Sequence, residues 1–172
     1  MLISASYNNL IKSYHLPRIE EIPDLELYMD QVIIYVKKYF SVFPYASESN
    51  FITPAMINNY VKSGLMPSPV GKKYTRRHIA YILAVFFLKQ IYSLEEVRAF
   101  INLQLSHGSE KECYELFCDI LETELKKCIA EEDNDVINIP SKNIGEKTIR
   151  HAALSIANKL YSQELIKQHF KK

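Results

Sequence analysis

Glycine is scarce in this chain. Only four glycines occur among 172 residues, at positions 64, 71, 108 and 145. Glycine-rich phosphate loops and dinucleotide fingerprints need several glycines close together, because the backbone must come very near the phosphate groups. Nucleotide-binding folds that depend on such loops are therefore disfavoured.

Cysteines and long apolar runs are also few. Cys113, Cys118 and Cys128 fall in one expected helix without a CxxC spacing, so we expect buried thiols in a reducing compartment. The longest apolar run, residues 79–88, is about half of the roughly 20 residues that a membrane span needs. The N-terminus lacks the charged and apolar regions of a signal peptide. The sequence predicts a soluble, cytoplasmic protein without a membrane partner.

Acidic residues are absent from the middle of the chain. Lysine plus arginine number 21 and aspartate plus glutamate 20, which gives a net charge of only +1. Residues 49–94 nevertheless carry six basic and no acidic residues, between two flanks in which acidic residues are in excess. This asymmetry indicates an anionic partner for the middle of the chain.

Residues that perform catalysis do not form a recognisable motif. The five histidines are scattered, and the sequence contains neither an HExxH motif nor a Gly-x-Ser-x-Gly nucleophile elbow. We expect no enzyme activity, no cofactor and no metal site.

Apolar residues recur every three or four positions through most of the chain, which predicts an all-α protein. Residues 1–23 are expected to form an extended lead-in. Asp24 is expected to cap the first helix, Thr53 with Pro54 to start the second, and Gly64 to end it. Prolines and a glycine make residues 65–74 a loop or a small β-wing. The expected helices cover about 24–43, 54–63, 75–92, 94–105, 109–131 and 143–170.

The expected helix 54–63 has two different faces. Ile57 and Val61 point inward, whereas the opposite stripe presents amides and a cation. An asparagine can pair bidentately with adenine, and a lysine can bind guanine or phosphate. The pattern suits a helix in the major groove of DNA, and the alternative is an ordinary solvated face. The outer stripe consists of Ala55, Asn58, Asn59 and Lys62.

A basic cluster follows this helix. Lys72 and Lys73 lie at the tip of the expected loop, and Arg76 and Arg77 in the first turn of the next helix. Cations at a helix N-terminus oppose the helix dipole. A bound phosphate would turn this unfavourable arrangement into a favourable one. The alternative is that both arginine side chains extend into solvent without a partner.

Three short motifs resemble the N-terminal domain of MerR-type regulators. They read ITPAMINNYVKSGLMP, KKYT and SLEEVRAFI, and the resemblance covers about residues 52–101. It implies a winged helix-turn-helix, binding to double-stranded DNA and a dimeric state. Asn58 and Asn59 stand where that family has an arginine and a tyrosine, so its base contacts do not transfer. Tyr60 matches a family tyrosine, and it is either a DNA contact or a core residue.

The chain as a whole is most similar to a bacterial family named only domain of unknown function 1836. The similarity rests on the motif LPRIEEIPDLELYMDQV, on the helix-turn-helix-like part and on the sequence ANKLY near the C-terminus. That family has no established activity.

We therefore expect an N-terminal extension (1–23), a MerR-like winged helix-turn-helix domain (24–105) and a C-terminal helical region for dimerisation or sensing (106–172). The predicted function is sequence-specific DNA binding in transcription regulation, with a recognition helix at about 54–63 and a basic wing at about 67–74. The alternative is a protein-interaction module built on a winged helix that no longer binds DNA. The expected partners are double-stranded DNA and a second copy bound through the C-terminal helices, together with a possible unknown effector or protein.

The predicted DNA-binding residues lie in the recognition helix, the wing and the start of the following helix. One feature outside this region has no explanation as a solvated residue, because Glu124 falls in the apolar stripe of the helix 109–131. It requires either a cation from a neighbouring helix or a partner. The predicted contact residues are Thr53, Ala55, Asn58, Asn59, Tyr60, Lys62, Lys72, Lys73, Tyr74, Arg76 and Arg77.

Overall fold

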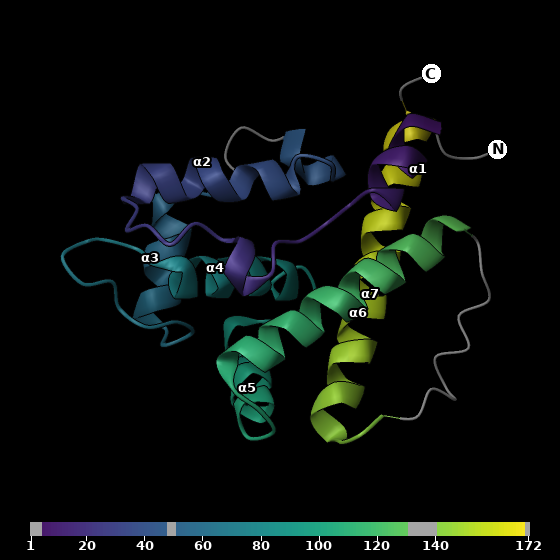
Figure 1. Ribbon diagram of the computed structural model, residues 1–172. Helices are drawn as coiled ribbons and strands as arrows, with labels where there is room; N and C mark the ends of the chain where they lie inside the picture. Colours follow the sequence, from purple (N-terminus) through teal and green to yellow (C-terminus); the bar gives the residue numbers. More distant parts are fainter. Residues whose placement is uncertain (1–4, 48–50, 131–140, 171–172) are drawn as a thin grey trace.

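The computed structural model describes residues 5–47, 51–130 and 141–170 (Figure 1). Regular structure in these ranges is helical, and the only β-type pairing is two isolated bridges. The prediction of an all-α protein is thus confirmed. The helices are α1 (Ala5–Lys12), η1 (Ile19–Glu21), α2 (Met29–Phe40), η2 (Pro44–Ser47), α3 (Pro54–Lys62), α4 (Arg76–Leu88), α5 (Leu94–Leu105), α6 (Glu110–Ala130) and α7 (Ile144–His169).

Helix α4 lies at the centre of the molecule, as its apolar composition predicts. Nine of its 13 residues are buried. Figure 1 shows α2 above it, α5 below it and the crossing pair α6 and α7 to its right. Aromatic rings connect α2 to α4, because the ring centroid of Phe40 lies 4.2 Å from that of Phe86 and 5.0 Å from that of Phe87.

Helices α6 and α7 pack against each other and cross at an angle (Figure 1). Three small residues of α7, Ala152, Ala153 and Ala157, are fully buried. Small side chains at a crossing point allow two helices to approach closely. The run EEDND at residues 131–135, which its polarity predicts to be a connector, lies outside the described residues.

The N-terminal segment folds differently from the expectation of an extended lead-in. It contains α1 and η1, and α1 packs against α6. Ile11, Leu16 and Ile22 are at most 1% exposed. They belong to one hydrophobic core that also includes residues of all the other α-helices. A helix of eight residues has little propensity of its own, so tertiary packing decides that it forms.

Helix α2 begins at Met29 and ends at Phe40, so the prediction that it spans 24–43 with Asp24 as its cap is wrong. The reason is a backbone pairing: Leu27 N donates to Tyr74 O over 2.9 Å, and Tyr74 N donates to Leu27 O over 2.8 Å. This pairing holds Leu27 in an extended conformation. Gln31 then accepts a hydrogen bond from the Tyr28 backbone N–H at 2.9 Å and caps the helix.

The starts of α3, α5, α6 and α7 follow local signals in the sequence. The end of α3 also does, because Gly64 adopts a positive φ of 66°. Helix α4 ends at Leu88, earlier than the expected residue 92, and short-range turns follow it. In each of α3, α5, α6 and α7, a backbone N–H of the first turn donates to the side chain of the capping residue. The pairs are Met56 to Thr53 at 3.3 Å, Glu96 to Ser93 at 3.2 Å, Glu112 to Ser109 at 3.3 Å and Glu146 to Asn143 at 2.9 Å.

Glu124 is buried, with 3% exposure, and its cation comes from its own helix. Lys127 Nζ lies 3.1 Å from Glu124 Oε1, so the cation is not supplied by a neighbouring helix, which was one of the two alternatives expected. The cysteines are free thiols, of which Cys118 and Cys128 are buried and Cys113 is half-buried. Of the helices described, none combines the length and apolarity needed to cross a membrane.

Candidate nucleic-acid interface

The outer stripe of α3 is exposed, and its inner face is buried. Ile57 and Tyr60 are at most 3% exposed, and Val61 is half-buried. This is the division between an anchoring face and a presenting face that the periodicity predicts. The exposed residues are Pro54, Ala55, Asn58, Asn59 and Lys62.

Helix α3 is held at both ends. Thr53 caps its N-terminus, and after its C-terminus Leu65 N donates to Tyr60 O over 2.9 Å. Arg98 of α5 donates a hydrogen bond to the carbonyl oxygen of Ser63. A cation at the C-terminus of a helix also interacts favourably with the helix dipole. Arg98 was not among the predicted site residues, and it fixes the position of α3 against α5.

The predicted wing is a single tight turn. Gly71 and Lys72 have positive φ values of 57° and 60°, and Lys73 N donates to Val70 O over 3.0 Å. Positive φ at both central residues is characteristic of a type I′ hairpin turn. The Lys72 side chain is exposed at the tip, and it has no ion pair to any residue that the structure describes. The base of the turn is the bridge between Leu27 and Tyr74.

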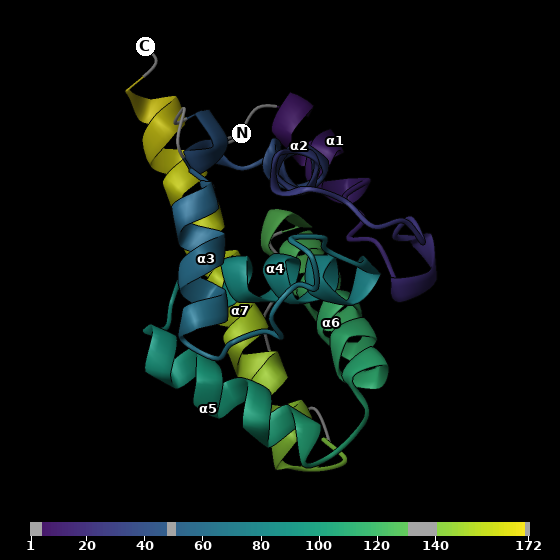
Figure 2. The ribbon, with the colours of Figure 1, turned by 90° about the vertical axis from the view of Figure 1, so that its left-hand side faces the viewer.

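The turn and α3 lie on the same side of the molecule. Figure 1 shows the loop between α3 and α4 beside α3, far from the crossing of α6 and α7. In Figure 2, which views the molecule from that side, both face the viewer. The structure thus brings α3 and the loop that carries Lys72 to one side of the molecule.

Three of the four cations of the basic cluster are paired with carboxylates. Lys73 lies 2.9 Å from Glu26, Arg76 lies 2.7 Å from Glu20 and 3.5 Å from Asp24, and Arg77 lies 2.5 Å from Glu110. The carboxylates come from the segment before α2 and from α6. They offset the unfavourable placement of cations at the start of α4, so the arginines do not extend into solvent without partners.

The N-terminus of α4 is capped from within the chain. The backbone N–H of Thr75 donates to His78 Nδ1 over 3.1 Å. Burial lowers the pKa of His78, and the charge of Arg77 lowers it further. The neutral imidazole can therefore act as an acceptor at neutral pH. This cap occupies a position at which we expected a phosphate.

Two predicted contact residues lie inside the protein. Tyr60 and Tyr74 are each 3% exposed, and burial raises the pKa of Tyr60 to about 12. Their side chains belong to the hydrophobic core. Of the two roles expected for Tyr60, the structure shows the core position, and the rings of both tyrosines anchor α3 and the turn.

The sequence does not predict the carboxylates that neutralise the basic cluster. Glu20, Asp24 and Glu26 lie some 50 residues before their partners, and Glu110 lies 33 residues after Arg77. The one available signal was the excess of acidic residues on both flanks. Such an excess does not identify which carboxylate meets which cation.

Comparison with known proteins identifies a family for this chain, and the description of that family gives no activity. No curated protein and no solved structure matches the chain. A family model described as domain of unknown function (DUF1836) matches residues 17–117. The match runs from the segment before η1 to the first part of α6, and it covers more than half of the chain. The chain therefore belongs to the DUF1836 family.

Proposed function

We propose that this protein is a sequence-specific DNA-binding transcriptional regulator that uses α3 as its recognition helix. The observation that carries the proposal is the exposed face of α3, which presents Asn58, Asn59 and Lys62. The acid-free stretch around it leaves no carboxylate on this helix to repel phosphates. The two amides supply the donor and acceptor pairs that read adenine in the major groove.

The proposed contacts to the DNA backbone come from two lysines. Lys62 ends α3 and Lys72 lies at the tip of the turn, and neither forms an ion pair with a residue in the described ranges. Both ammonium groups are therefore available to displace counterions from the duplex. Lys73, Arg76 and Arg77 would first have to leave their carboxylates, so they are secondary contacts in this proposal.

The arrangement is a variant of the winged helix-turn-helix that MerR-type regulators use. The helix before the recognition helix is α2, and the connection from Ser41 to Thr53 is longer than the turn of about three or four residues in a simple helix-turn-helix. The wing is reduced to the type I′ turn. We propose that two copies bind a two-fold symmetric site through their C-terminal helices, since such symmetry matches two half-sites.

A protein-interaction module is the second candidate, and the pairing of the basic cluster favours it. Three of its four cations already have carboxylate partners at distances of 2.5 to 2.9 Å. A surface neutralised in this way attracts a polyanion weakly. In this alternative, the exposed face of α3 contacts another protein.

The deciding experiment selects duplexes from a randomised library with the purified protein and then measures affinity by fluorescence anisotropy. Enrichment of a sequence that binds more tightly than a scrambled duplex supports the proposal. Lys62→Glu should abolish this binding, and Lys147→Glu should leave it intact. Lys147 is also exposed and lies in the first turn of α7, and the two Lys-to-Glu variants change the net charge by the same amount.

The same experiment discriminates the second candidate. Absence of enrichment, together with equal retention of every duplex by wild type and by Lys62→Glu at low salt, overturns the DNA-binding proposal. A stoichiometric protein partner that Asn59→Arg displaces would then support the interaction module.

A further inference from the structure

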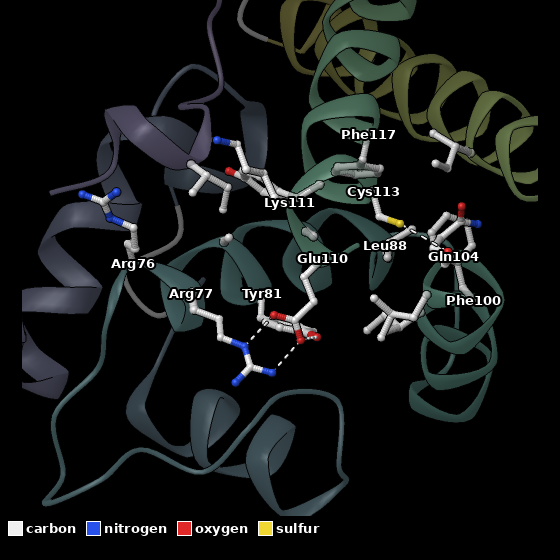
Figure 3. A pocket seen from close by; sticks show the side chains of 17 residues that line it. Arg76, Arg77, Tyr81, Leu88, Phe100, Gln104, Glu110, Lys111, Cys113 and Phe117 are labelled. Carbon is white, nitrogen blue, oxygen red and sulfur yellow. Dashed lines mark hydrogen bonds and ion pairs between the residues drawn. The ribbon is translucent and has the colours of Figure 1, made fainter. Parts of the chain in front are cut away.

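A cavity of about 280 Å³ lies between α4, α5 and α6 (Figure 3), and no residue of α3 lines it. Ile19 of η1 and Ile149 of α7 complete its walls. Most of the lining is apolar. At the end opposite the arginines, Figure 3 shows Leu88, Phe100 and Cys113. The volume is close to the lower end of ligand sites, which hold roughly 300 Å³ or more.

Charged groups gather at the other end of the cavity. Arg76 and Arg77 reach it from α4, and Lys111 and Glu110 from α6 (Figure 3). The cavity lining therefore contains three cations and one carboxylate. A site with an apolar interior and an excess of positive charge at its mouth is complementary to an apolar molecule with one anionic end.

The two arginines differ in how firmly they are held. Arg77 binds Glu110 through two hydrogen bonds, and Tyr81 donates a third to the same carboxylate. Arg76 and Lys111 instead share Glu20, whose oxygens lie 2.7 Å and 2.8 Å from them. Glu20 is outside the cavity lining, and its side chain is 65% exposed. Exposed ion pairs contribute little net free energy, so another carboxylate can replace Glu20 at small cost.

We propose that this cavity binds an amphiphilic carboxylate, with its apolar tail among the rings of Phe100 and Phe117 and its carboxylate on Arg76 and Lys111 in place of Glu20. A tail of about ten carbon atoms suits the volume. The inference does not depend on DNA binding, because neither the cavity nor its charged end uses a residue of α3.

Isothermal titration calorimetry with decanoate, below its micelle concentration, tests the inference. Decanol and decylamine have the same tail and serve as controls for the charge of the head group. Decanoate should bind more tightly than decanol by up to about fivefold, because only its head group forms an ion pair with Arg76 and Lys111, and an exposed ion pair contributes at most about 1 kcal/mol. Decylamine should bind most weakly. Equal affinity for decanoate and decanol, or no binding of decanoate, overturns the proposal.

Three variants examine the head-group site. Lys111→Glu should weaken decanoate binding by about tenfold and leave decanol binding unchanged, whereas the control Lys147→Glu should affect neither. Glu20→Gln should strengthen decanoate binding up to about fivefold, because it removes the carboxylate that the ligand displaces. An unchanged affinity in Glu20→Gln would contradict the replacement of Glu20.

Alkylation of Cys113 provides a second measurement of ligand binding, and it needs no amino-acid substitution in the cavity. It is half-buried and lines the cavity, whereas Cys118 and Cys128 are buried. Decanoate should slow the alkylation of Cys113, as measured by peptide mass spectrometry, and decylamine at the same concentration should not. An alkylation rate that decanoate leaves unchanged counts against a ligand inside the cavity.

Discussion

Arg77 and Glu110 form a two-pronged ion pair that joins α4 to the start of α6. Arg77 Nε lies 2.6 Å from Glu110 Oε2, and Arg77 Nη2 lies 2.5 Å from Glu110 Oε1. The hydroxyl of Tyr81 donates to the same carboxylate over 2.7 Å. Bidentate arginine-carboxylate pairs are both stronger and more directional than single contacts. This pair connects the acid-free stretch to the C-terminal helices.

The first prediction concerns the pH dependence of this pair. The hydrogen bonds from Arg77 hold the pKa of Glu110 below its usual value of 4.5. The pair therefore stabilises the fold above the unfolded-state pKa, and this contribution is lost as the pH falls through the lower folded-state pKa. We expect Glu110→Gln to lower the free energy of unfolding at pH 7, and the difference from wild type to shrink toward pH 3. Urea unfolding measures it.

Tyr81→Phe is the matched variant for this prediction, because it removes one hydrogen bond to Glu110 and keeps the arginine pair. It should produce a smaller effect with the same pH dependence. A difference between Glu110→Gln and wild type that stays constant from pH 7 to pH 3 would show that the charge of Glu110 does not contribute.

The second prediction concerns sequence discrimination by α3. Asn58→Ala and Asn59→Ala should each make the protein discriminate less between a selected and a scrambled duplex. The difference in binding free energy between the two duplexes should fall by about 1 to 3 kcal/mol for each bidentate amide–adenine pair that the substitution removes. Affinity for the scrambled duplex should change little. Asn102→Ala, at an exposed position of α5, is the control. If both α3 variants discriminate between the two duplexes as well as wild type does, the amides do not contribute to base recognition.

The third prediction separates the two lysines of the turn. Lys72 has no carboxylate partner among the residues described, whereas Lys73 is paired with Glu26. Lys72→Gln should reduce the slope of log affinity against log salt by about 0.9, since one fewer counterion is released. Lys73→Gln should reduce it less. Anisotropy titrations at several salt concentrations measure both slopes, and equal slopes would contradict the difference between the two positions.

The fourth prediction concerns the attachment of the N-terminal segment. Arg18 Nη1 lies 2.7 Å from Glu122, and its Nη2 lies 2.5 Å from Asp119. The side chain of Glu122 is only 10% exposed, so loss of the arginine leaves a nearly buried carboxylate without its nearest cation. Arg18→Ala should lower the free energy of unfolding by about 2 kcal/mol.

Lys126→Ala is the comparison for Arg18→Ala, because Lys126 contacts the same Glu122 at 3.8 Å from a more exposed position. Lys126→Ala should lower the free energy of unfolding by less than about 1 kcal/mol. Equal losses in the two variants, measured by chemical denaturation, would show that the N-terminal segment does not depend on Arg18.

The fifth prediction concerns the proposed dimer. Ile166 and Phe170 lie one turn apart near the end of α7 and are 58% and 82% exposed. If two copies of the chain associate through this exposed surface, Ile166→Glu should lower the sedimentation coefficient to that of a monomer. Ile144 at the other end of α7 has the same 58% exposure, so Ile144→Glu is the control. A dimer that survives Ile166→Glu would place the interface elsewhere.

Local signals in the sequence determined most helix starts and the two faces of α3. Thr53, Ser93, Ser109 and Asn143 cap their helices through hydrogen bonds that span only three residues. Gly64 ends α3 for an equally local reason. Such interactions depend on neighbours along the chain, so they can be inferred without knowledge of the fold.

Only the tertiary structure decided where α2 begins and which charges meet. Leu27 pairs with Tyr74 across 47 positions, and Glu20 meets Arg76 across 56. The same holds for Tyr60, whose ring could face DNA or the core in the sequence but is buried in the fold. Pairings between distant residues depend on how the helices pack as three-dimensional bodies, and hydrophobic periodicity indicates only which face of a helix turns inward.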